Sequence, residues 1–187
     1  MIPIHEQGTG HGIGHSLRSF LVRFELLCQE QLRDGQARAF AFLFYDFCDQ
    51  ELRRILRDRG VFAELDRLSG TNLSFFYLHA GRRRTIERFN AEFLERLGVD
   101  TDVQLPCVVF FRVNEDRIED VTLAELENAN LIHGFRELYR VVESYIREEL
   151  YENTGEPKYM RLLKSSTRFV SIESFRVLLR SVLDGLI

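Results

Sequence analysis

The sequence contains no tryptophan, only three cysteines and three prolines, and its only lysines are Lys158 and Lys164. Three scattered cysteines cannot form a disulfide scaffold and are typical of a protein from a reducing, intracellular compartment. No apolar run approaches the roughly 20 residues that a membrane-spanning helix needs, and the glycine-rich start lacks the apolar core of a signal peptide. We therefore expect a soluble, cytoplasmic protein with no membrane span.

The residues that are present are typical of a globular domain. The chain has 187 residues, of which 45% are hydrophobic and 29% charged, with a net charge of −4. This length fits one domain, or one domain with an appendage, and the composition excludes wholesale disorder, collagen and coiled coil. The mildly acidic charge and the lack of a basic, aromatic ribbon argue against nucleic acid as a partner. The high arginine content fits either anion recognition or genomic base composition.

Residues 1–15 are expected to form a flexible tail or a loose edge segment, because they hold four glycines and no sustained periodicity. The alternating glycines from Gly8 to Gly14 do not make a phosphate-binding loop, since no strand precedes them and no Gly-Lys-Ser/Thr follows. His5, His11 and His15 lie in the same segment. No cysteine or acidic cluster completes a ligand set around them, so we predict no metal site.

Helices and strands are expected to alternate along the next part of the chain. Helical spacing of apolar residues predicts helices at 17–34, 49–68 (broken at Gly60), 84–97, 123–127 and 135–151. Continuous apolar runs predict buried strands at 38–47, 73–79 and 107–113, and a turn at 114–116 leads into a short strand at 117–121. Strands joined through helices imply parallel crossovers, and the hairpin adds an antiparallel strand. The predicted fold is an α/β domain with three layers, α/β/α, around a mixed central sheet.

Residues 153–157 (Asn-Thr-Gly-Glu-Pro) are the best candidate linker in the chain. We accordingly expect one domain over residues 16–152. Residues 153–187 would then form a C-terminal helical extension, with its last helix near 171–186, packed on the domain or on a partner.

Two local features, in this order of elements, resemble the thioredoxin-like superfamily over roughly residues 16–150. The first is Phe44-Tyr45-Asp46-Phe47-Cys48, a strand end that leads through Asp49-Gln50-Glu51 into a helix. The second is Gln104-Leu105-Pro106-Cys107, which opens a buried strand followed by a polar turn and another strand. In that family a proline at this place is cis and faces the redox motif. The resemblance therefore implies a structural cis-proline at Pro106.

The sequence departs from this family at its redox motif. The second cysteine would fall at Glu51, so Cys48-Asp49-Gln50-Glu51 keeps only the first. A dithiol oxidoreductase needs a resolving thiol beside the attacking one to release its mixed disulfide. We therefore expect a divergent member without ordinary thioredoxin activity.

Cys48 and Cys107 are the candidate reactive residues. Cys48 would lie at a helix N-terminus, where the dipole stabilises a thiolate. Three carboxylates close in sequence, Asp46, Asp49 and Glu51, oppose this by like-charge repulsion. Under the resemblance Cys107 would come near Cys48, which makes a disulfide or a two-thiol switch one alternative. The other is that Cys107 is a small apolar residue of a buried strand.

Arg82, Arg83 and Arg84 follow a predicted strand and open a helix. Anions are favoured at helix N-termini, so this cluster fits a contact with an anion or an acidic partner. The alternative is a solvated surface cluster without a ligand.

The C-terminal segment is the main non-catalytic feature. Residues 158–187 carry six basic and two acidic residues, a net +4, which leaves −8 for residues 1–157. The last predicted helix is apolar over a broad face, and it must bury that face against its own domain, a second protomer or a partner. The residues expected at such a contact are Phe175, Arg176, Leu178, Leu179, Arg180 and Leu183.

These features lead to two functional hypotheses. The first is a non-dithiol thioredoxin-like domain that is not an enzyme, needs no cofactor and acts as a protein-interaction or regulatory module. Its partner would be another protein, or a second copy, bound through the last helix. The alternative is a monothiol redox protein that uses Cys48, with glutathione or with Cys107.

Overall fold

The computed structural model of the chain describes residues 2–5, 15–16, 26, 30, 33–34, 38–71, 73–99, 103–114, 117–126, 131–147 and 161–162. Its strands are β1 (Ile2–His5), β2 (His15–Ser16), β3 (Arg38–Phe44), β4 (Leu73–His79), β5 (Cys107–Asn114), β6 (Arg117–Glu125) and β7 (Arg161–Leu162). Its helices are α2 (Gln50–Ile55), α3 (Arg59–Ser69), α4 (Arg83–Arg96) and α5 (Leu131–Tyr145).

The described strands pair in the order β2-β1-β4-β3-β5-β6-β7. Neighbours from β2 to β3 are parallel, and β5, β6 and β7 each run antiparallel to the strand before them in that order. The crossover between the parallel strands β3 and β4 contains α2 and α3. The α/β class and the mixed sheet are thus confirmed.

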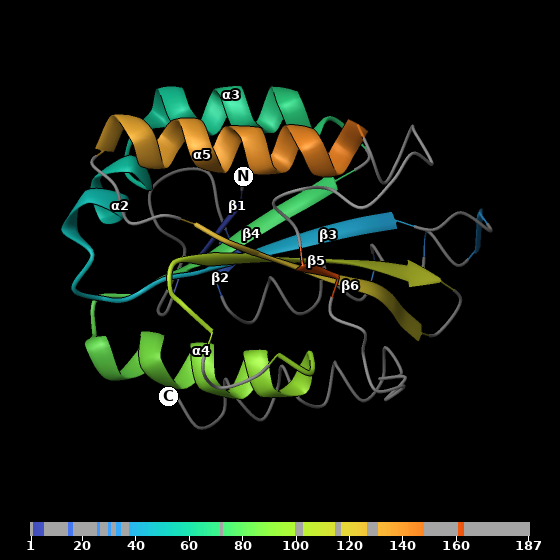
Figure 1. Cartoon of the computed structure of the whole chain (residues 1–187), viewed down its shortest axis with the longest axis horizontal. Coiled ribbons are helices and arrows are strands. Elements are labelled where there is room, and N and C mark those ends of the chain that lie inside the picture. Colours follow the sequence, from blue (N-terminus) through green and yellow to red (C-terminus); the bar gives the residue numbers. More distant parts are fainter. Residues whose placement is uncertain are drawn as a thin grey trace.

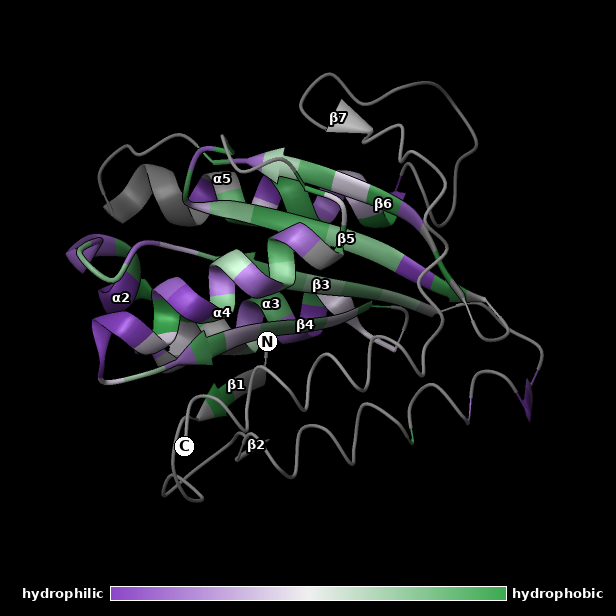
Figure 2. Cartoon of the chain, turned by 90° about the horizontal axis from the view of Figure 1, so that it is seen from below, coloured by the Kyte–Doolittle hydropathy of each residue, from purple (hydrophilic) through white to green (hydrophobic). Residues whose placement is uncertain are grey.

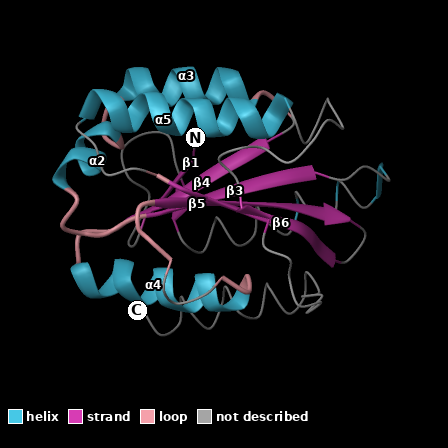
Figure 3. Ribbon diagram, in the orientation of Figure 1, coloured by secondary structure: helices cyan, strands magenta, loops and turns pink. Residues whose placement is uncertain are grey.

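Helices lie on both faces of this sheet. Figures 1 and 3 show α3 and α5 side by side over one face and α4 over the other. Among the described residues, no helix combines the length and the hydropathy that crossing a bilayer requires.

Aromatic side chains fill the space between the sheet and α4. Phe42, at the middle of β3, lies 5.3 Å from the Phe93 ring and 5.8 Å from the Phe111 ring. Phe93 in turn stacks on Phe89 at 4.4 Å, and all four side chains are buried. On the opposite face Phe110 stacks on Tyr145 of α5 at 4.2 Å. In Figure 2 the green of hydrophobic residues accordingly dominates β5.

The break between α2 and α3 differs from the prediction. It lies before Gly60, because Asp58 caps α3 and its carboxylate accepts a hydrogen bond from the Gly60 N–H at 2.8 Å. Aspartate is a strong helix-start signal, and it sets the boundary here.

The C-terminal end of the helix predicted at 84–97 is as expected. Gly98, at φ +76°, ends α4 with bonds to the carbonyls of Glu95 and Leu94 from its own and the following N–H.

Two predicted boundaries near β6 are wrong. The expected helix at 123–127 is not formed, since β6 continues to Glu125 and residues 122–125 pair with residues 107–110 of β5. Cross-strand pairing outweighs the local helical preference of Leu-Ala-Glu. The following helix, α5, begins at Leu131 and not at residue 135.

Both ends of the chain contribute strands that the sequence analysis did not predict. Of the N-terminal segment, expected to be a flexible tail or a loose edge segment, Ile2–His5 forms β1 beside β4, and Ile4 is fully buried. Within the C-terminal extension, Arg161–Leu162 pairs with β6. Leu26, Glu30, Arg33 and Asp34 of the predicted 17–34 helix are helical. The predicted linker at 153–157 and the last helix at 171–186 lie outside the described residues.

Candidate functional site

The turn after β3 is held by the side chains of two aspartates. Asp46 Oδ1 accepts a hydrogen bond from the Cys48 N–H at 2.6 Å, and the Asp46 carbonyl accepts one from the Asp49 N–H at 3.1 Å. Asp49 Oδ1 accepts from the Leu52 N–H at 2.9 Å and thereby caps α2. These carboxylates therefore place charge near Cys48 and also fix the backbone that carries the thiol.

Two buried hydrogen bonds anchor this turn to the rest of the domain. The Tyr45 hydroxyl donates to the Leu78 carbonyl of β4 at 2.8 Å, and Asn90 of α4 donates through Nδ2 to the Tyr45 carbonyl at 2.9 Å. Burial raises the pKa of Tyr45 to about 12, against the opposing effect of Arg53 and Arg57. The phenol therefore stays protonated and remains a donor at neutral pH.

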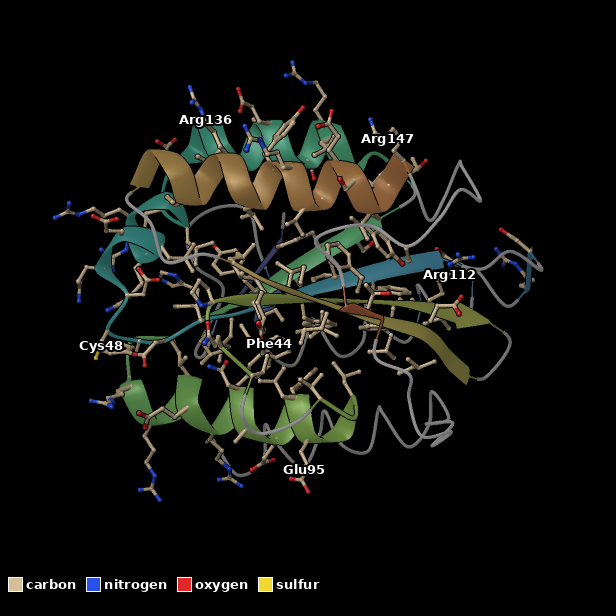
Figure 4. All side chains as sticks on the ribbon, viewed as in Figure 1. Phe44, Cys48, Glu95, Arg112, Arg136 and Arg147 are labelled. Carbon is tan, nitrogen blue, oxygen red and sulfur yellow. The ribbon has the colours of Figure 1, made fainter. Side chains whose placement is uncertain are left out.

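An open pocket of about 850 Å³ lies beside the turn. It is lined by Asp46, Cys48, Asp49, Gln50, Glu51, Val103 and Leu105. One wall is thus acidic and comes from the turn and α2, while the other is apolar and comes from the segment before β5. Figure 4 shows Cys48 at the end of the molecule where α2 and α4 begin.

The apolar wall precedes a cis peptide bond between Leu105 and Pro106. The Pro106 carbonyl accepts a hydrogen bond from the Leu126 N–H at 2.8 Å. The Gln104 N–H donates to Glu125 Oε1 at 3.2 Å. The end of β6 therefore positions the backbone on both sides of Leu105, although sequence patterns alone had not singled out Leu105 or Val103 as lining residues.

The two described cysteines lie in contrasting environments, and both are free thiols. Cys48 is exposed, whereas Cys107 is fully buried at the start of β5, opposite Phe44 of β3. Burial, together with the nearby charge of Glu125, raises the pKa of Cys107 to about 12. Cys107 is therefore a neutral core thiol at physiological pH. Cys28 lies outside the described residues.

The arginine cluster at the start of α4 lies near this pocket through Arg83. Arg82 is the N-cap residue of α4 but makes no side-chain capping bond, and all three arginines, Arg82, Arg83 and Arg84, are exposed. Arg83 Nε donates to Glu87 Oε1 at 2.6 Å, and this bond is the main reason why the pKa of Arg83 is raised. Cys48 and Asp46 also contribute to this increase, so the Arg83 guanidinium lies close to the turn that carries Cys48.

The remaining candidate positions fall in a part of the chain that the structure does not describe. The predicted contact residues Phe175, Arg176, Leu178, Leu179, Arg180 and Leu183 lie outside the described residues. Within the part of the chain that is described, no three histidine, cysteine or acidic side chains are grouped so as to hold a metal ion.

The arrangement offers an accessible thiol in a pocket with one acidic and one apolar wall. Glu51 lies in the first turn of α2 at the third residue after Cys48, and a carboxylate cannot resolve a mixed disulfide. The site can bind a ligand, or its one thiol can undergo thiol–disulfide exchange with an external partner. No protein-family model, curated protein or solved structure matches this chain.

Proposed function

We propose that this chain is a thioredoxin-like domain without dithiol chemistry that acts as a protein-interaction module in the cytoplasm, with the pocket beside Cys48 as its binding site. One observation carries the proposal. The exposed Cys48 has a carboxylate, Glu51, where a resolving thiol is required, and Cys107 is buried and neutral. A pocket that lacks a resolving thiol is better suited to binding than to disulfide turnover.

The thioredoxin-like assignment is supported by the order of the central strands. In the strand order β1-β4-β3-β5-β6, the first three strands are parallel to one another, β5 is antiparallel to β3, and β6 is antiparallel to β5. The cis bond before β5 and the turn from β3 into α2 lie at the positions that the resemblance implies.

The two walls of the pocket indicate the chemistry of the partner. Asp46, Asp49 and Glu51 favour lysine or arginine side chains by charge complementarity. Val103 and Leu105 favour an adjacent apolar side chain. We therefore propose a protein segment that combines basic and apolar residues. The basic, apolar C-terminal segment of residues 158–187 remains, on its sequence alone, a second proposed surface for a partner or for self-association.

The test uses Cys48 as the attachment point for a photo-crosslinking maleimide, in the full chain with Cys28→Ser. A matched control carries Cys48→Ser and Glu95→Cys, which places the same probe at an exposed position at the far end of α4 (Figure 4). After illumination in cell extract, we expect defined adducts from position 48 that Asp46→Asn with Asp49→Asn removes. Equal adducts from both positions, or adducts unaffected by the two asparagines, would contradict the proposed binding site.

The second candidate function is monothiol redox chemistry at Cys48, and the exposure of this thiol beside Arg83 favours it. In this chemistry Cys48 would take glutathione from a protein mixed disulfide, releasing the protein thiol. A second glutathione thiol would then free Cys48 and leave as glutathione disulfide. A deglutathionylation assay of a glutathionylated peptide decides between the two: turnover that Cys48→Ser abolishes supports the redox function, and no turnover supports the binding module.

A further inference from the structure

The peptide group between Phe47 and Cys48 is held by side chains at both of its ends. Its N–H, which belongs to Cys48, donates to Asp46 Oδ1 at 2.6 Å. Its C=O, which belongs to Phe47, accepts a hydrogen bond from Arg53 Nη1 at 3.3 Å. A peptide group is planar and rotates as a unit, so these two bonds together fix its orientation. The orientation of this plane limits the directions in which the Cys48 side chain can leave the backbone.

Arg53 reaches this peptide group from α2, six residues further along the chain than Phe47. Its guanidinium carbon, Cζ, lies 4.1 Å from the centre of the Phe47 ring. One guanidinium thus contacts both the ring and the carbonyl of the same residue, because a planar guanidinium can stack on a ring and also donate in its own plane. Phe47 is itself half-buried and packs against the core. Arg53 therefore joins the turn that carries Cys48 to α2.

Arg54, the next residue of α2, provides a matched comparison. Both arginines lie in the last turn of this helix, where positive charge is favourable. Arg54 is exposed, whereas Arg53 is half-buried against the Phe47 ring. An effect of charge on the helix is common to both residues, but an effect on the Phe47–Cys48 peptide group is expected of Arg53 alone.

We propose that Arg53 is a positioning residue of the site beside Cys48. Together with Asp46, it holds the Phe47–Cys48 peptide group in one orientation and so sets how Cys48 is presented to the pocket that it lines. A wall that is already ordered before binding lowers the entropy cost of binding. The inference deepens the proposed binding function and rests on it for this consequence.

Hydrogen exchange at single amides of the full chain, measured by NMR at neutral pH, tests the role of Arg53. We expect Arg53→Met to accelerate exchange of the Cys48 N–H about fivefold, because the variant loses a hydrogen bond and a cation–π contact. Arg54→Met should leave this exchange unchanged. Loss of a positive charge alone would slow an exchange that hydroxide catalyses, so acceleration cannot be an effect of charge. Arg53→Lys keeps the charge but not the planar donors, and should give an intermediate rate.

The Leu56 N–H, which donates to the Leu52 carbonyl at 2.8 Å, reports on α2 as a whole. Its exchange should be the same in the parent chain and in all three variants. Equal acceleration at Leu56 and Cys48 would show that Arg53 only stabilises the helix, and would overturn the positioning role. Unchanged exchange at Cys48 in Arg53→Met would overturn it as well. If Arg53→Met does not fold, Arg53→Lys decides by the same comparison of the two amides.

Cross-linking from Cys48 connects this role to binding. In the cell-extract experiment proposed for the pocket, Arg53→Met should reduce the defined adducts from position 48 several-fold, and Arg54→Met should not. Undiminished adducts in Arg53→Met would overturn Arg53 as a positioning residue of the binding site. If the parent chain forms no specific adducts, the proposed binding site is wrong, whereas exchange at Cys48 needs no partner and still decides whether Arg53 holds the peptide group.

Discussion

The centre of the sheet and the turn that carries Cys48 are held in different ways. At the centre, Phe42 is fully buried and contacts aromatic rings from β4, β5 and α4. At the turn, Asp46 and Cys48 are exposed, and hydrogen bonds from backbone N–H groups to two carboxylates fix the backbone. Packing therefore sets the fold, while the pocket depends on individual polar contacts. It follows that the chemistry of the pocket can change with little effect on the sheet.

The largest expected loss of stability is at the centre of the sheet. Phe42→Ala should lower the free energy of unfolding by about 3–5 kcal/mol, because it removes a ring enclosed by other rings and leaves a cavity. Urea denaturation followed by circular dichroism measures this loss. The exposed control Glu95→Ala should stay within about 0.5 kcal/mol of the parent chain. A loss at Phe42 as small as the control's would break the contrast between the two regions.

The next largest loss of stability is expected at the hydrogen bond that joins the two regions. Asn90→Ala removes the buried amide that donates to the Tyr45 carbonyl and leaves that carbonyl unpaired. We expect a loss of about 1–3 kcal/mol, together with faster hydrogen exchange in residues 46–50. A loss in stability without faster exchange in the turn would show that Asn90 stabilises the core but does not hold the pocket.

Alkaline pH should lower the stability of the folded chain through the buried thiol of Cys107. The pKa of Cys107 is raised from 9.0 to about 12 in the folded chain, so above pH 9 the unfolded chain loses a proton that the folded chain keeps. This group should therefore leave the free energy of unfolding unchanged below pH 9. As the pH rises from 9 towards 12, it should lower that free energy by at most about 1.4 kcal/mol per pH unit. Denaturant titrations at pH 8, 9 and 10 measure the slope. Cys107→Ala should make it shallower; an unchanged slope would contradict the burial of this thiol.

The smallest expected effect is at the turn itself. Asp49→Ala removes the cap of α2 and should cost about 0.5–2 kcal/mol, whereas Asp49→Asn keeps a capping oxygen and should cost less. Thermal unfolding of the two variants side by side gives the comparison. If the asparagine variant loses as much as the alanine variant, the charge of Asp49, and not its hydrogen bond, stabilises the turn.

Sequence patterns predicted the packed parts of the molecule better than the polar ones. The strands predicted at 38–47, 73–79 and 107–113 are present because uninterrupted apolar runs must be buried on both faces, although the first ends at Phe44 and the third at Asn114. β1 was not predictable, since Ile2–His5 is short, contains a proline and pairs with β4, which is distant in sequence. The end of β6 has the sequence pattern of a helix, and this local preference competes with its pairing to β5.

The candidate site was predictable only in part. Cys48 and Pro106 were identified by resemblance, and the carboxylates around Cys48 were visible in the sequence. The apolar wall was not, because Val103 and Leu105 approach Cys48 only through the folding of two separate segments. The same holds for Asn90, whose hydrogen bond to Tyr45 crosses from α4 to the end of β3.

We propose that the site beside Cys48 does not carry out dithiol exchange, and reduction of insulin disulfides by dithiothreitol tests this most directly. We expect the unmodified chain to be no faster than dithiothreitol alone and Cys48→Ser to be indistinguishable from it. Glu51→Cys, which supplies the missing thiol, is the matched gain-of-function variant and should accelerate the reaction. Clear acceleration by the unmodified chain that Cys48→Ser abolishes would contradict the account.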